Sequence, residues 1–120
     1  MADRMLFIGW NEPVRGREER ALEVFDEAMG ILGRMQQEGR IESFDVCLLA
    51  PSPQLGGYMT IRGTQQQIDA LRQDPDFQRN TVDAGLSVDG ITHLEGFTDE
   101  GVAQQMALYR EAIQKVPQRA

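Results

Sequence analysis

Cysteine, histidine and basic residues are scarce in this chain, and each shortage excludes a class of protein. A single cysteine, Cys47, forms no intramolecular disulfide and no cysteine-rich zinc site. A single histidine, His93, leaves a histidine-based metal site short of ligands. The 12 Lys and Arg residues are outnumbered by 19 Asp and Glu residues. The resulting net charge of -7 repels phosphate backbones and argues against nucleic-acid binding.

Long apolar runs are also missing. The N-terminal MADRMLFIGW carries charges beside its short apolar stretch, so it reads neither as a signal peptide nor as a membrane span. We therefore expect a cytoplasmic protein that does not bind membranes. The 120 residues, 41% of them hydrophobic, suffice for one domain with a core. A chain of this size often gains stability by forming oligomers.

The spacing of apolar residues predicts the first elements. MLFIGW (5–10) is a short apolar and aromatic run, typical of a buried strand. From Arg17 to about Glu38, apolar residues recur every three or four positions, as on one face of a helix. The stretch 41–63 alternates apolar and polar residues on both sides of a loop. It predicts two strands, and the loop from Pro51 to Gly57 reads as an open hairpin connection or a mobile flap.

Capping signals predict the helices that follow. Thr64 and Gln67 have the spacing of a capping box, in which each side chain bonds to the other residue's backbone N–H. Asp74 suits an N-cap and Pro75 the first helical position, so a helix restarts there.

The rest of the chain predicts a strand and a last helix. Residues 86–97 alternate loosely, and Thr98 suits the cap of a helix with one apolar stripe. The stripe consists of Val102, Met106, Tyr109, Ile113 and Val116. The order β-α-β-β-α-β, with right-handed crossovers, predicts one antiparallel sheet with both main helices on the same face. We expect a single α+β, ferredoxin-like domain over 1–120, with 98–116 as an appended helix and one bare sheet face.

Three stretches carry a resemblance to a known group: RMLFIGW (4–10), LGGYMTI (55–61) and LRQDPDF (71–77). With the order of elements, they make residues 4–97 resemble the dimeric α+β-barrel superfamily. That group includes YCII-related, EthD-like and antibiotic-biosynthesis-monooxygenase-type proteins. The resemblance implies a homodimer in which two bare sheet faces form a barrel, often around a ligand cavity. The first helix lacks the histidine of YCII-related proteins, so no catalytic residue is carried over.

Alternation also assigns side chains to the two faces of the sheet. Phe44, Val46, Leu48, Met59 and Ile61 are expected under the helices. The bare face then holds Ser43, Asp45, Cys47, Tyr58, Thr60 and Arg62. On the fourth strand we place Asp89, His93 and Glu95 on the barrel side, an assignment that a single bulge would reverse.

His93 and Arg62 are the candidate catalytic residues. His93 suits a general base oriented by Glu95 or Asp89, and it equally suits a strand histidine that merely bonds to a carboxylate. A metal site on His93 and Glu95 is the weaker reading. Arg62 suits either a clamp for a carboxylate or enolate, or a cross-strand ion pair with Asp45.

The remaining candidates fit a pocket wall as well as ordinary packing. Tyr58 suits a hydrogen-bond donor to a ligand or an interface residue, Cys47 a small buried filler, and Trp10 core or pocket wall. The predicted barrel pocket is lined by Trp10, Asp45, Cys47, Tyr58, Thr60, Asp89 and Glu95.

The sequence leaves two classes of function open. The first is an enzyme that acts on a small aromatic or carbonyl-bearing metabolite by monooxygenation or proton transfer, without a cofactor. The second is a dimer that binds a small ligand, or regulates, without chemistry. A haem-handling role has no second ligand to support His93. No metal is expected.

Overall fold

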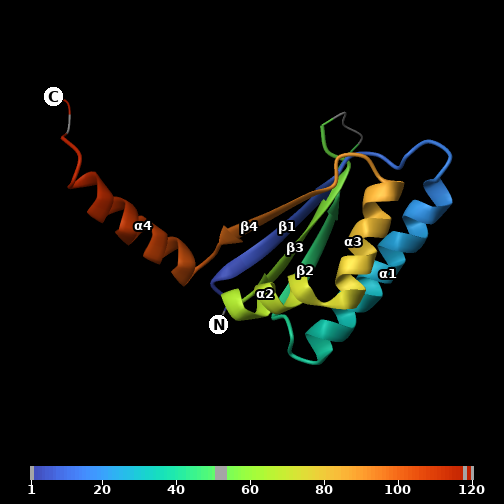
Figure 1. The fold of residues 1–120 in the computed structure, drawn as a ribbon, viewed down its shortest axis with the longest axis horizontal. Helices are drawn as coiled ribbons and strands as arrows, with labels where there is room; N and C mark the ends of the chain where they lie inside the picture. Colours follow the sequence, from blue (N-terminus) through green and yellow to red (C-terminus); the bar gives the residue numbers. More distant parts are fainter. Residues whose placement is uncertain (1, 51–53, 118, 120) are drawn as a thin grey trace.

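Four antiparallel strands form one sheet, and helices cover one of its faces (Figure 1). A computed structural model describes residues 2–50, 54–117 and 119. The strands are β1 (Arg4–Trp10), β2 (Ser43–Leu48), β3 (Gly57–Gly63) and β4 (Thr92–Phe97). The helices are α1 (Glu18–Gln37), α2 (Gln65–Gln73), α3 (Pro75–Ser87) and α4 (Glu100–Ile113).

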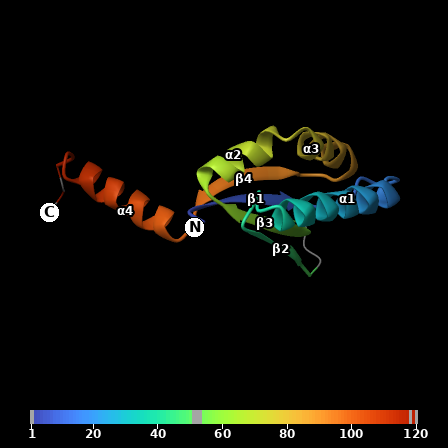
Figure 2. The same ribbon diagram turned by 90° about the horizontal axis from the view of Figure 1, so that it is seen from below.

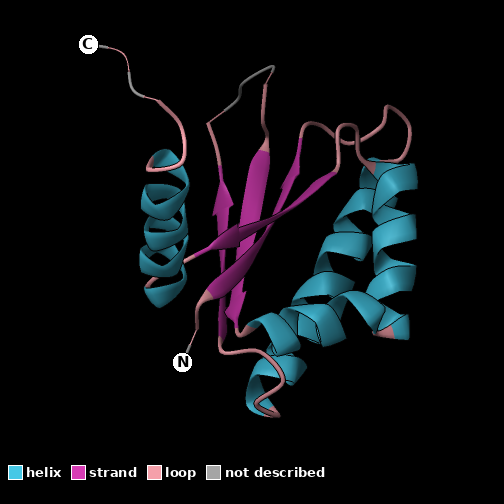
Figure 3. Cartoon of the chain, turned by 60° about the vertical axis from the view of Figure 1, so that its left-hand side comes forward, coloured by secondary structure: helices cyan, strands magenta, loops and turns pink. Residues whose placement is uncertain are grey.

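The strand order β2-β3-β1-β4 puts β1 and β3 in the centre and β2 and β4 at the edges. The connection from β1 to β2 runs through α1, and the connection from β3 to β4 runs through α2 and α3. These helices lie on the same side of the sheet (Figure 3). This arrangement is the ferredoxin-like α+β fold, so the predicted fold class is confirmed.

The core lies between the sheet and helices α1, α2 and α3. Leu6, Leu32 and Ile61 are fully buried there, and Ile8, Met35, Met59 and Phe77 lie among them. Alternation along β1 and β3 turns every second residue toward these helices. The opposite face of the sheet is not covered by α1, α2 or α3, which all lie on the other side (Figure 3). We call it the bare face.

The local capping predictions are confirmed. Thr64 Oγ1 accepts a hydrogen bond from Gln67 N at 3.1 Å, and Gln67 Oε1 accepts one from Thr64 N at 2.9 Å. Asp74 caps α3 by accepting from Phe77 N at 3.0 Å. The same carboxylate meets Arg40 at 2.8 Å, which lowers the Asp74 pKa and ties the α1–β2 connection to α3.

Three predicted boundaries near the C-terminus are wrong. Helix α3 continues through Ser87, and β4 begins only at Thr92, because the chain first turns at Gly90, where φ is 68°. Asp99, with φ 50°, stands at the N-cap of α4 and makes no side-chain cap bond, so Thr98 is not the cap. The predicted 98–116 helix is also shorter than expected, since it ends at Ile113.

Part of the predicted flap, residues 51–53, lies outside the described residues. Helix α4 leaves the end of β4 and extends away from the rest of the molecule (Figures 1 and 2). None of the helices in the described part of the chain combines the length and apolarity that a membrane crossing requires.

Candidate functional site

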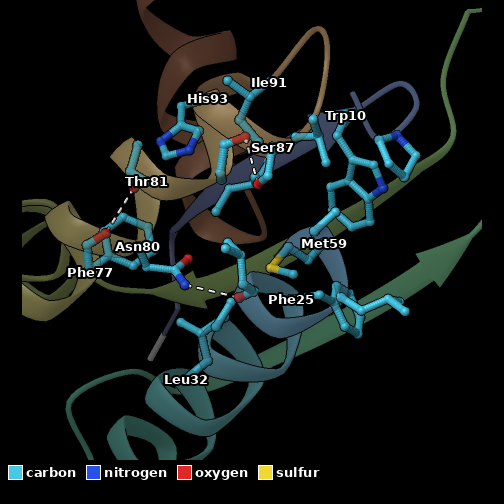
Figure 4. Close-up of a pocket in the computed structure, with 18 of the residues that line it drawn as sticks. Trp10, Phe25, Leu32, Met59, Phe77, Asn80, Thr81, Ser87, Ile91 and His93 are labelled. Atoms are coloured by element: carbon cyan, nitrogen blue, oxygen red, sulfur yellow. Dashed lines mark hydrogen bonds between the residues drawn. The ribbon is translucent and has the colours of Figure 1, made fainter. Parts of the chain in front are cut away.

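A cavity of about 220 Å³ lies between the sheet and helices α1 and α3 (Figure 4). Most of its lining is apolar. The sheet contributes Ile8, Trp10, Met59 and His93, and the helices contribute Phe25, Leu32, Phe77 and Asn80, among others. An enclosure with apolar walls and a few polar groups is the usual form of a site for a small molecule.

Trp10 forms one wall of this cavity. Its ring meets Phe25 of α1 edge to face, with centroids 6.0 Å apart and planes at 68°. Gly57 lies opposite Trp10 on β3, and a Cβ added there would come within 2.7 Å of the indole ring. The glycine therefore gives the indole room to lie against the sheet and to face the helices.

His93 lies on another side of the cavity, beside the ring of Phe77 at a centroid distance of 6.0 Å (Figure 4). Burial lowers the pKa of the imidazole, and the charge of Arg72 lowers it further. Within residues 2–50, 54–117 and 119, no hydrogen bond to the His93 ring is formed. Both effects favour the neutral imidazole, whose unprotonated nitrogen can accept a hydrogen bond from a molecule in the cavity.

Asn80 is a buried polar side chain in the cavity wall, and it bonds to another element. It is 8% exposed, and its Nδ2 donates to the Val24 carbonyl of α1 at 3.0 Å, which links α3 to α1. The hydroxyls of Thr81 and Ser87 donate instead to carbonyls of their own helix, at 2.9 and 2.8 Å. The carbonyl oxygen of Asn80 is not used in its bond to α1 and can accept from a ligand.

The predicted face of His93 is wrong. His93 stands opposite the core residue Ile8 of β1, and Glu95 stands opposite Leu6, so both face the helices. Glu95 pairs with Arg72 of α2 at 3.0 Å rather than orienting the imidazole. Asp89 lies before β4, in the turn, where its backbone bonds to that of the segment after β1.

The faces of β2 and β3 are as predicted. Met59 and Ile61 are buried under the helices, and Tyr58, Thr60 and Arg62 point to the bare face. Leu48 is the exception to the expected core. It borders the cavity yet is largely exposed at the end of the edge strand.

On the bare face, Tyr58 stacks on Phe7 of β1 with centroids 5.5 Å apart. Cys47 lies opposite Tyr58 in the register, and a hydrogen bond between them raises the pKa of the tyrosine hydroxyl. The predicted pair of Arg62 with Asp45 is wrong. Asp45 stands opposite Thr60, and Arg62 meets Asp99 at 3.6 Å.

The sheet therefore separates the residues that the sequence placed in one pocket. Trp10 and His93 line the cavity under the helices, and Asp45, Cys47, Tyr58, Thr60 and Arg62 occupy the other face. Sequence reasoning missed Asn80. A usable signal existed, because Phe77, Asn80 and Ser87 share one face of a helix and a polar residue amid an apolar face suggests a special role.

Metal binding finds no support in the described part of the chain, where no group of three His, Cys, Asp or Glu side chains is placed to hold an ion.

Comparison with known proteins finds likeness in structure only. No protein-family model and no curated protein sequence matches this chain. Solved structures that share its fold include a dimeric protein of unknown function with a ferredoxin-like fold from Bacteroides fragilis. Another is a dimeric ferredoxin-like protein of unknown function from Jannaschia sp.. The first has a TM-score of 0.61 at 8% identity, over 79% of this chain and 95% of its own. The second has a TM-score of 0.60 at 16% identity, over 78% and 97%.

The chain is ferredoxin-like in structure as well as in topology. A third similar structure is SnoaB, a cofactor-independent oxygenase from Streptomyces nogalater. Its TM-score is 0.50 at 16% identity, over 82% of this chain and 93% of its own. At these identities the likeness extends to the fold alone.

Proposed function

We propose that the protein binds a small aromatic molecule in the cavity between the sheet and helices α1 and α3. The observation that carries this proposal is the half-buried imidazole of His93, which receives no hydrogen bond from the described residues and lies in a mostly apolar enclosure. Trp10, Phe25 and Phe77 offer ring contacts to a flat ligand. His93 and Asn80 offer acceptors for a hydroxyl group on it.

The chemistry that fits this arrangement is proton transfer. A neutral His93 takes the proton of a phenolic or enolic hydroxyl, and the substrate anion remains in the apolar cavity. Such an electron-rich anion is the kind of species that O2 attacks without the help of a cofactor. The fold shared with SnoaB, a cofactor-independent oxygenase, supports this direction.

Binding without turnover is the second candidate. The observation that favours it is the pairing of Glu95 with Arg72, because the carboxylate nearest in sequence to His93 is thereby engaged elsewhere. The base then lacks the orienting partner that catalytic histidines usually have.

We also propose that the protein is a homodimer in which two bare sheet faces meet as a barrel. The aromatic pair Phe7–Tyr58 and the 56% exposed Leu94 lie on this face, which favours burial against another apolar surface. Two similar structures are of dimeric proteins, which supports a homodimer. Arg62 and Thr60 would then lie at the sheet–sheet interface.

The test uses 4-nitrophenol, a small phenol whose anion has its own absorption band. Trp10 is the only tryptophan and forms a cavity wall, so its fluorescence reports occupancy. We expect saturable quenching and an excess of nitrophenolate in the bound state. Ala28→Phe should abolish saturable quenching by filling the cavity, and Ala70→Phe, on the outer side of α2, should not.

His93→Gln separates binding from proton transfer. We expect quenching to persist in this variant while the nitrophenolate excess disappears. Quenching of the wild type that does not saturate, or that Ala28→Phe leaves unchanged, would contradict the cavity as the binding site. A nitrophenolate excess that persists in His93→Gln would contradict the role of His93.

A further inference from the structure

Helix α4 exposes an apolar stripe to solvent in the isolated chain. Val102 is 46% exposed, Met106 44% and Tyr109 61%. These residues follow one another at spacings of four and three, so they share one side of the helix. Large apolar side chains gathered on one exposed helix face are typical of a surface that another chain covers.

The path of α4 is set by the body of the protein and not by this stripe. Gly101 packs so closely on the backbone of Asp3 that a Cβ there would clash with it. Thr98 N donates to Asp3 O at 3.1 Å, and Asp99 meets Arg62 of β3 at 3.6 Å. The start of the helix is thus held against Asp3, just before β1, and against β3, while the rest of the helix extends away from the body (Figure 1).

The direction of α4 indicates what covers it. In Figure 3 the sheet stands between α4 and the other three helices, so α4 extends on the side of the bare sheet face. A second molecule seated on that face would lie beside α4. One occupant would therefore cover both the bare face and the helix that flanks it.

We infer that α4 is a dimer arm whose stripe, Val102, Met106 and Tyr109, packs against the second copy of this chain. This inference rests on the proposed barrel homodimer and adds a second contact to it. In a two-fold dimer each protomer gives one arm and receives one, so each contact of the stripe occurs twice. The arm thereby enlarges the interface beyond the contact between the sheets.

The experiment compares two variants of the full chain by sedimentation over a dilution series. M106Q/Y109Q removes apolar groups from the stripe, and A107Q/L108Q makes the same number of changes on the far side of α4, where Leu108 is also exposed. Glutamine keeps helix propensity in both. We expect the first variant to raise the dimer dissociation constant about tenfold or more, equivalent to about 1.4 kcal/mol, and the second to leave it within about twofold.

The outcomes separate the arm from the barrel. Equal dissociation constants for the two variants and the wild type overturn the arm and leave the barrel dimer standing. A wild type that is monomeric throughout the series overturns the barrel dimer and the arm with it. If the dimer is too tight to dilute apart, the rate of subunit exchange between differently labelled dimers gives the same comparison. In that case faster exchange for M106Q/Y109Q alone supports the arm, and equal exchange overturns it.

Discussion

Replacing Asn80 tests whether the buried polar group in the cavity wall stabilises the fold. Asn80→Leu removes the bond from Nδ2 to the Val24 carbonyl, which is 3.0 Å long and closed to solvent. A bond of this kind contributes about 1 kcal/mol net. The Val24 carbonyl lies inside α1 and keeps its helical partner, so it is not left unsatisfied. Because leucine has nearly the shape of asparagine, little cavity or overpacking cost is added.

We therefore expect Asn80→Leu to lower the free energy of unfolding by about 1 kcal/mol. For a domain of this size that corresponds to a fall in Tm of about 3–6 °C. Urea denaturation followed by circular dichroism measures the change, and the slope with urea concentration should stay constant, because the surface exposed on unfolding is unchanged.

Thr81→Val is the matched control, since the Thr81 hydroxyl bonds only to the Phe77 carbonyl of its own helix and its loss should cost less. An Asn80→Leu variant as stable as the wild type, or more stable, would refute the reasoning. It would show that the hydrogen bond between α3 and α1 stabilises the fold by no more than the burial of the amide destabilises it. Asn80 would then be a polar group kept in the wall at a cost, as binding sites often require.

Three further predictions concern the titrating histidine, a helix cap and the bare face. His93 has a lowered pKa in the folded chain, so below about pH 6.5 the unfolded chain takes up a proton that the folded chain does not. The free energy of unfolding therefore falls as pH falls. His93→Gln should weaken this pH dependence below about pH 6.5, and an equal pH dependence in both proteins would contradict the prediction. Asp74→Ala should cost about 1 kcal/mol by removing the cap on Phe77 N, whereas Asp74→Ser should retain most of it; equal losses in thermal denaturation would assign the effect to the Arg40 pair instead. Leu94→Arg should give a chain of monomer mass, 13.5 kDa, in light scattering, because it places a charge in the proposed sheet–sheet interface, and an intact dimer would show that the bare face is not the interface.

Much of this architecture follows from signals within a few residues of one another. The stripe along 17–38 forms α1, the capping residues Thr64 and Asp74 begin α2 and α3, and alternation along 43–63 separates the two faces of β2 and β3. Each of these features depends on helical or strand periodicity and on bonds that span three or four residues. The order of such elements leaves few right-handed topologies, which is why the ferredoxin-like fold could be predicted without a structure.

The face that His93 occupies was decided only in the folded chain. Residues 92–97 carry polar groups on both sides, so their alternation contains no preference strong enough to choose a face. Pairing with β1 determines the face. Leu6 and Ile8 are buried under the helices, and the strand register places their partners Glu95 and His93 on the same side of the sheet.

The cavity depends on tertiary structure for the same reason. Trp10, Phe25, Asn80 and His93 come from four elements, and no local pattern relates their positions. Likewise Arg62 pairs with Asp99 instead of Asp45, because the turn into α4 brings the Asp99 carboxylate to the end of β3. Local periodicity tells which residues are buried, whereas the strand register and the packing of helices on the sheet determine which buried residues meet.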